Sequence, residues 1–425
     1  AMPRALTRAP GGPLSAASAQ TVVDSLQGEL VHRGLENVRV TIGRGATDVT
    51  IEIEYENRSY EQNELDALGI VLGLAAMRTP ASVTLLRAVI KQVNLKVLDV
   101  TVPAASWLSF VNGGESKAAF ASELRISETV HDADMTELAG TRVAARSLFK
   151  ADVFVRPRVE TTLLTEWGVA DARFSALPEA QMQVGPGTTV DVRGVIPVDR
   201  TRNFPGTVDD PFLDRALVLQ ALNVPLGAAR ASLLTQFSAG RYLPGVVGAG
   251  NEVALSLAGG ILGLKATAVR LGRTFGSLDR WVALGSARAR YPAWDATLNV
   301  TAGKFLDGDR GVSGDMSRFF GNTEAGVFVR HSGNGTLAGI RFALPLTVRR
   351  ELPPWRVRPR LPDVYSYEQR STILGDRNEA RSDIGRPLST DHEVERIFQD
   401  RDRAHAAIIR RHVESLRAAV RHLLD

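Results

Sequence analysis

The chain has 425 residues, about three times the length of a typical domain, so we expect two or more structural units. It contains no cysteine, which excludes disulfides, thiolate metal sites and a cysteine nucleophile. Its 51 lysine and arginine residues nearly balance its 47 acidic residues. Because the basic residues are scattered along the chain, we do not expect the protein to bind nucleic acid.

The first 17 residues are rich in proline, glycine and alanine and lack hydrophobic periodicity, so we expect an extended leader. The chain starts at Ala1 without a basic-then-apolar signal, and we expect a mature form from which a signal has been removed. No apolar run approaches the roughly 18 to 20 residues of a membrane-spanning helix.

Residues 18–114 have the pattern of a compact α+β unit, in which helical and strand periodicities alternate. The order helix–hairpin–helix–hairpin–helix suggests two related halves that pack their helices on one face of a small sheet. The patterns predict helices over 20–33, 62–78 and 103–110, and strands over 38–42, 49–55, 83–93 and 95–102.

Residues 115–149 are polar and poorly patterned, and we interpret them as a connecting segment. From 150 to 349, glycine- and proline-rich turn signals recur about every 10 to 16 residues. This spacing predicts about 12 to 14 strands.

The strand pattern is clearest in residues 294–302, where apolar residues occupy the even positions and Asp, Thr or Asn the odd ones. Period two with one apolar face indicates antiparallel strands, in either a soluble sandwich or a membrane barrel. Closing a barrel removes exposed sheet edges, and a sandwich of this size would usually divide into two domains. The pattern favours a mainly β fold: an antiparallel transmembrane β-barrel of about 12 to 14 strands, with an N-terminal α+β domain and a C-terminal helical tail.

Polar side chains on the inner face of such a barrel are the candidate functional residues. They would line a polar lumen and offer hydrogen bonds along it. Alternatively, they fill the lumen with salt bridges and make a plugged structural barrel. The alternation selects Asp295, Thr297, Asn299, Thr301, Glu324, Arg330 and Arg341.

Residues 350–425 form a tail of different character. Its Pro/Arg-rich part at 353–362 is expected to be extended and stiff. A long charged helix is predicted over 391–424, with one apolar stripe. The stripe suggests docking onto a partner or onto the chain's own N-terminal unit; a solvated helix with a thin apolar face is the alternative.

Catalytic patterns are weak, and we expect no enzyme activity, no catalytic, cofactor-binding or metal residues, and no cofactor. His392 and Glu393 lack the second histidine of a zinc motif. Asp307 and Asp309 could form a carboxylate pair, but they lie in a glycine-rich turn, where Asp commonly bonds its own backbone.

Several segments resemble one bacterial family, the YjbH-like (GfcD-like) outer-membrane proteins of exopolysaccharide and group 4 capsule export. The similarity is clearest at Ala302–Gly311, a strand end with its hairpin loop. It extends over most of residues 20–361 and includes 34–40, 54–58, 64–69, 317–320, 323–328 and 339–346.

This resemblance implies an outer-membrane β-barrel with a periplasmic domain, acting in polysaccharide secretion. The expected function is guiding or passing polysaccharide across the bacterial outer membrane. The expected partners are outer-membrane lipid, the polysaccharide, and other envelope or export-complex proteins that dock through the periplasmic domain and C-terminal helix. A non-transporting structural subunit of an envelope or cell-surface complex is the alternative, because the leader and tail have the character of partner-binding arms.

Overall fold

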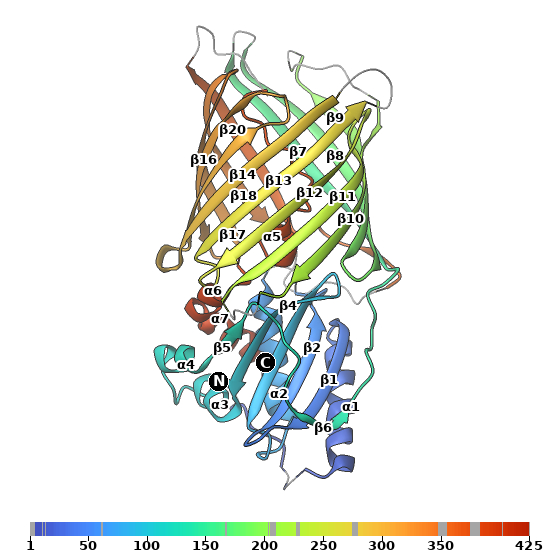
Figure 1. Cartoon of the computed structure of the whole chain (residues 1–425), viewed down its shortest axis with the longest axis vertical. Helices are drawn as coiled ribbons and strands as arrows, with labels where there is room; N and C mark the ends of the chain where they lie inside the picture. Colours follow the sequence, from blue (N-terminus) through green and yellow to red (C-terminus); the bar gives the residue numbers. More distant parts are fainter. Residues whose placement is uncertain are drawn as a thin grey trace.

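The computed structural model describes residues 5–424 apart from 11, 13, 61–62, 166–167, 203, 205–209, 227–229, 274–278, 347–354, 375–382 and 402. Strands dominate, in one sheet of six strands and one of 14 (Figure 1). Among the described residues, no helix is both long and apolar enough to cross a membrane.

The N-terminal unit, residues 16–140, is built on the six-stranded sheet. Its helices and hairpins lie where the periodicities predict them, within a few residues. The elements are α1 (Ala16–His32), β1 (Glu36–Arg44), β2 (Val49–Glu56), α2 (Glu64–Arg78), β3 (Leu85–Gln92), β4 (Leu95–Pro103) and α3 (Ala104–Val111). The connection through α2 makes β2 and β3 parallel neighbours, and the other neighbours in the sheet are antiparallel.

Residues 115–149, interpreted from the sequence as a connecting segment, contain regular secondary structure. This stretch contains α4 (Lys117–Glu123), β5 (Arg125–Ser127) and β6 (Thr136–Gly140). The two strands pair with β4 and β1, and the sheet order is β5-β4-β3-β2-β1-β6. They are short edge strands that bury few apolar residues, so they carry little alternation for a sequence pattern to detect.

The large sheet winds through the chain as consecutive antiparallel hairpins, β7 to β18, followed by two further strands. The strands are β7 (Ala151–Thr165), β8 (Gly168–Gly185), β9 (Thr188–Arg200), β10 (Phe212–Val224), β11 (Ser232–Leu243), β12 (Val246–Leu257), β13 (Leu262–Arg273), β14 (Asp279–Tyr291), β15 (Ala296–Lys304), β16 (Arg310–Phe320), β17 (Thr323–Ser332), β18 (Gly335–Pro345), β19 (Val357–Pro359) and β20 (Val364–Leu374). The sheet thus runs past its predicted end at 349, because β20 pairs with β18 and β19 pairs in parallel with β7.

The large sheet is strongly curved, so β20 comes to lie beside β7 (Figure 1). Side chains connect these two strands: the Thr161 hydroxyl lies 2.6 Å from the Tyr367 hydroxyl and donates to Gln369 Oε1 at 2.5 Å. The described backbone ladders leave β19 and β20 as the ends of the sheet order. The curvature gives the sheet a concave inner face and a convex outer face.

The long helix predicted over 391–424 is instead three short helices: α5 (Val394–Phe398), α6 (Ala406–Arg411) and α7 (Val413–Leu424). The break after α5 contains Asp400 and Arg401, which both have left-handed backbone (φ 46° and 51°). Helix α5 lies within the large sheet, whereas α7 packs on α2 of the N-terminal unit (Figure 1). Leu416 and Val420 of α7 are fully buried there, so the apolar stripe docks onto the chain's own N-terminal unit.

Candidate functional site

The large sheet carries most of its polar side chains inside and exposes apolar side chains outside, with a small apolar cluster around Leu217, Leu271 and Val282 on the inner face. On β15, Leu298 and Val300 are 52% and 43% exposed, whereas Thr297, Asn299 and Thr301 are partly buried. Exposed Val, Leu, Ile, Met and aromatic side chains recur along the outer face of nearly every strand of this sheet. A water-soluble sheet protein would bury those residues, so this outer face suits an apolar environment.

The predicted inner residues of β15 form a hydrogen-bonded row on the concave side. The Thr301 hydroxyl lies 2.8 Å from the Ser286 hydroxyl on β14. The Asn299 side chain donates to Asp315 on β16 at 3.0 Å and to Thr301 at 3.2 Å. Thr297 lines a cavity at the end of the sheet nearest the N-terminal unit.

Of the other predicted residues, the charged ones are paired with carboxylates or arginines of the sheet. Arg330 makes a two-pronged contact with Glu368 on β20, at 3.0 and 2.9 Å. Arg341 lies 2.8 Å from Asp315 and 3.6 Å from Glu324. Arg330 and Arg341 therefore each reach over one strand of the inner face to Glu368 and Asp315, and Arg341 also links the neighbouring strands β18 and β17 through Glu324.

Asp295 departs from its prediction as a strand residue. It follows the short 3-10 turn Pro292–Trp294 in a left-handed conformation (φ 50°), and β15 begins after it. Its carboxylate lies 2.7 Å from Nε2 of His412, between α6 and α7. The alternation of apolar and polar residues thus continues into the turn without marking a strand there. Asp295 is not an inner strand residue and instead contacts the C-terminal helices.

The space inside the large sheet is occupied by the chain itself, through residues 383–398, which we name the interior segment. At the end of the sheet far from the N-terminal unit, Arg386 makes two contacts with Asp307, at 2.9 and 2.8 Å. The Gly385 amide donates to Asp309 at 2.8 Å. The two carboxylates that could have formed a catalytic pair thus hold the interior segment.

Midway along the interior segment, Asp391 lies between two arginines of the sheet. Its Oδ2 accepts from Arg215 of β10 at 3.2 Å and also contacts Arg193 of β9. Arg215 is only 1% exposed and donates to Asp191 at 2.6 Å as well. A buried guanidinium requires such carboxylate partners, because an unpaired buried charge is costly.

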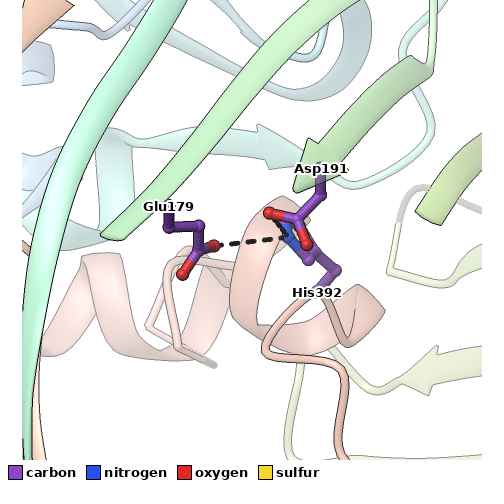
Figure 2. A group of neighbouring side chains, drawn as sticks. All are labelled: Glu179, Asp191 and His392. Atoms are coloured by element: carbon purple, nitrogen blue, oxygen red, sulfur yellow. Dashed lines mark ion pairs between the residues drawn. The ribbon is translucent and has the colours of Figure 1, made fainter. Parts of the chain in front are cut away.

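His392, the next residue, faces two carboxylates of neighbouring strands (Figure 2). Its Nε2 lies 3.2 Å from Asp191 of β9 and 3.9 Å from Glu179 of β8. These three side chains could supply three ligand atoms to a metal ion. Arg215 and Arg156 contact the same carboxylates, however, so the cluster is already charge-balanced and suits an ionic clamp better than a cation site.

A second clamp lies at the start of α5. Glu395 accepts from Lys265 of β13 at 2.7 Å and lies 3.4 Å from Arg288 of β14. The Val394 amide donates to Glu252 of β12 at 2.7 Å. The interior segment is therefore held by contacts with strands around most of the concave face.

A third cluster joins the N-terminal unit, the large sheet and the C-terminal helices. Glu128 accepts from Ser256 at 3.1 Å, from His405 Nδ1 at 3.2 Å and from the Ala406 amide at 3.3 Å. Burial alone would raise the pKa of Glu128, but the contacts with His405, the Ala406 amide and Ser256 together outweigh it and lower that pKa below its usual value.

Replacing Glu128 with Gln is expected to lower stability by about 2 kcal/mol at pH 7, since it removes the buried negative charge and one of the two acceptor oxygens that join three parts of the chain. Because the folded pKa is lowered, the contribution of the carboxylate is full above the unfolded pKa and is lost as pH falls through the folded pKa. Thermal unfolding of both proteins from pH 7 to pH 3 should therefore show the difference shrinking in acid. Glu123→Gln, at an exposed position on α4, is the control, and equal melting of Glu128→Gln and wild type at pH 7 would contradict the role.

No protein-family model, curated protein or solved structure matches this chain. The geometry of the interior is therefore the main guide to function. The sequence did not predict the ionic contacts of Asp391 and Glu395, because their partners lie far away in the chain. The one available signal was the presence of single charged residues on the inner face of the strands, since a buried charge needs a partner of opposite charge.

Proposed function

We propose that the protein is a bacterial outer-membrane β-barrel with a periplasmic N-terminal unit, acting in exopolysaccharide or capsule secretion. The single observation that carries the membrane assignment is the inverted pattern of the large sheet, with apolar residues outside and charged residues inside. Strands β7 to β18 and β20 each have at least nine residues, about what a tilted strand needs to cross a bilayer.

Exposed aromatic side chains support the same assignment. Five of the nine exposed aromatic residues in the described part of the chain lie at the end of the large sheet nearest the N-terminal unit, in or beside strand ends and turns, and the other four lie on the outer face of β8, β11, β14 and β18. Tyr and Trp favour the boundary between lipid and water, where an apolar ring and a polar group can both be satisfied. The five at this end are Phe149, Tyr291, Trp294, Phe320 and Trp355.

The secretion role rests on the resemblance of the hairpin segments, such as residues 302–311, to the exopolysaccharide export family, together with the polar inner face. Hydroxyl, amide and charged groups along that face can replace the water that surrounds a sugar chain. In the arrangement described, the interior segment occupies this path, so passage requires it to move aside. The apolar face of α7 is covered by α2 and is not open to a partner. We therefore propose that other envelope proteins dock on the N-terminal unit rather than on the C-terminal helix.

A non-transporting structural subunit is the second candidate. The observation that favours it is the interior segment itself, which is fixed by ionic contacts at both ends and in the middle. In that case the barrel is permanently plugged, and its function lies in holding other envelope components. Conductance after replacement of the interior segment separates the two candidates.

Membrane insertion is tested by single cysteines, introduced at Leu298 or Asn299 of this cysteine-free chain and labelled with a fluorophore. In lipid vesicles, the outward Leu298→Cys position should be quenched by bromine-labelled acyl chains and resist a water-soluble thiol reagent. The inward Asn299→Cys position should show weak quenching and serves as the matched control. Absence of lipid quenching at position 298 would overturn the barrel assignment.

A further inference from the structure

We propose that the inner wall holding the interior segment is a binding site for an acidic polysaccharide, and that the carboxylates of Asp391 and Glu395 occupy the places of sugar carboxylates. This inference rests on the proposed secretion function and names its substrate class. In this view the interior segment is a tethered, substrate-like plug.

The charges of the interior segment and the wall are complementary. Residues 383–398 contain four acidic and two basic side chains, so the segment carries a net negative charge. The wall meets its carboxylates with cations: Arg193 and Arg215 at Asp391, and Lys265 and Arg288 at Glu395. Arg193 and Arg215 lie on the neighbouring strands β9 and β10, and Lys265 and Arg288 lie on the neighbouring strands β13 and β14. Each pair of cations forms one carboxylate-binding position on the wall, which we call a station.

Each station also keeps carboxylates of its own on the wall. Asp214 contacts Arg193 at 2.7 Å, and Asp191 contacts Arg215 at 2.6 Å. Glu252 lies on β12 beside the second station. A cation that is already partly neutralised binds an incoming carboxylate moderately, which suits a polymer that must leave each station as well as enter it.

The N-terminal part of the interior segment, residues 383–393, can leave the wall without exposing a large apolar surface. Residues 383–393 contact the wall mainly through ionic and hydrogen-bonded groups, with Ile384 and Leu388 packing against small apolar clusters of the sheet. Val394 and Phe398, by contrast, are buried in the main hydrophobic cluster, which also contains Ala254 of β12. The attachment of α7 is apolar as well, with Leu416 and Val420 fully buried against the N-terminal unit. A polyanion can therefore replace the ionic contacts while the apolar anchor keeps the segment tethered.

The test uses a full-length variant in which residues 387–397 are replaced by a Gly/Ser linker, reconstituted in planar bilayers. Oligogalacturonate, a uniformly carboxylated sugar chain, is expected to block the current at a concentration at least about tenfold lower than a neutral dextran of similar length, and added salt should weaken this block. Adding Lys265→Gln and Arg288→Gln should abolish most of the preference. Arg270→Gln, an exposed outward position on the same strand as Lys265, is the control and should keep it.

Equal block by oligogalacturonate and dextran, or an unchanged preference after removal of both cations, would overturn the acidic-substrate inference and leave the secretion barrel standing. A folded, inserted linker variant that passes no current would instead remove the transport function, and this inference with it. The two failures are distinguished by whether the current exists.

Discussion

Replacing residues 387–397 with a Gly/Ser linker is expected to raise the bilayer conductance of the full-length protein at least about tenfold over a nearly closed wild type. The reason is geometric: the interior segment contacts β8, β9 and β10 through His392 and Asp391, and β13 and β14 through Glu395. A flexible linker makes none of these ionic contacts and presents no side chains that fill the space. The measurement is single-channel current at fixed voltage.

Ser389→Ala is the matched control for this conductance prediction. The Ser389 side chain is exposed and bonds Glu393 within the interior segment itself, so its loss leaves the clamps to the wall intact. The control should stay closed. Equal, negligible current from the linker variant and from wild type, with both proteins folded and inserted, would favour the structural-subunit function over secretion.

The strands of the large sheet could be predicted because alternation is a local property of the sequence. Thr297, Asn299 and Thr301 have partly buried side chains and Leu298 is exposed, as period two requires. The helices of the N-terminal unit were also predictable, because an apolar face at helical spacing shows which residues a sheet will cover.

The path of the tail could not be predicted, because its determinants are pairs of residues far apart in the chain. Asp391 meets Arg193 and Arg215 only after the sheet has curved, and its sequence neighbourhood has the periodicity of a helix. A charged residue in a helical pattern is normally solvated, so the sequence alone gives no reason to place it inside a sheet. For the same reason the sequence predicts that Asp307 lies in a turn, but it does not predict that Arg386 is the ionic partner of Asp307.

Gly69→Leu is expected to detach the C-terminal helices from the N-terminal unit and to cost about 3 kcal/mol of stability. A Cβ atom at Gly69 would lie 2.5 Å from the Leu416 carbonyl oxygen and 2.9 Å from its Cα atom, so the α7 backbone itself must shift. Once α7 moves, Leu416 and Val420 lose the burial that anchors the tether. Lowered thermal unfolding and rapid tryptic cleavage after Arg417 are the expected readouts.

Gly28→Leu supplies the control for this substitution, since it makes the same change on a helix of the same unit. A Cβ atom at Gly28 meets nothing within 4 Å, and replacing a helical glycine with leucine should be neutral or stabilise by up to about 1 kcal/mol. If Gly69→Leu melts and is cleaved like Gly28→Leu, α7 is not packed against α2, and the interior segment has no apolar anchor. In the proposed barrel, a segment without the α7 anchor would leave the interior of the large sheet more readily when its ionic contacts break, so the tethered plug depends on the close packing at Gly69.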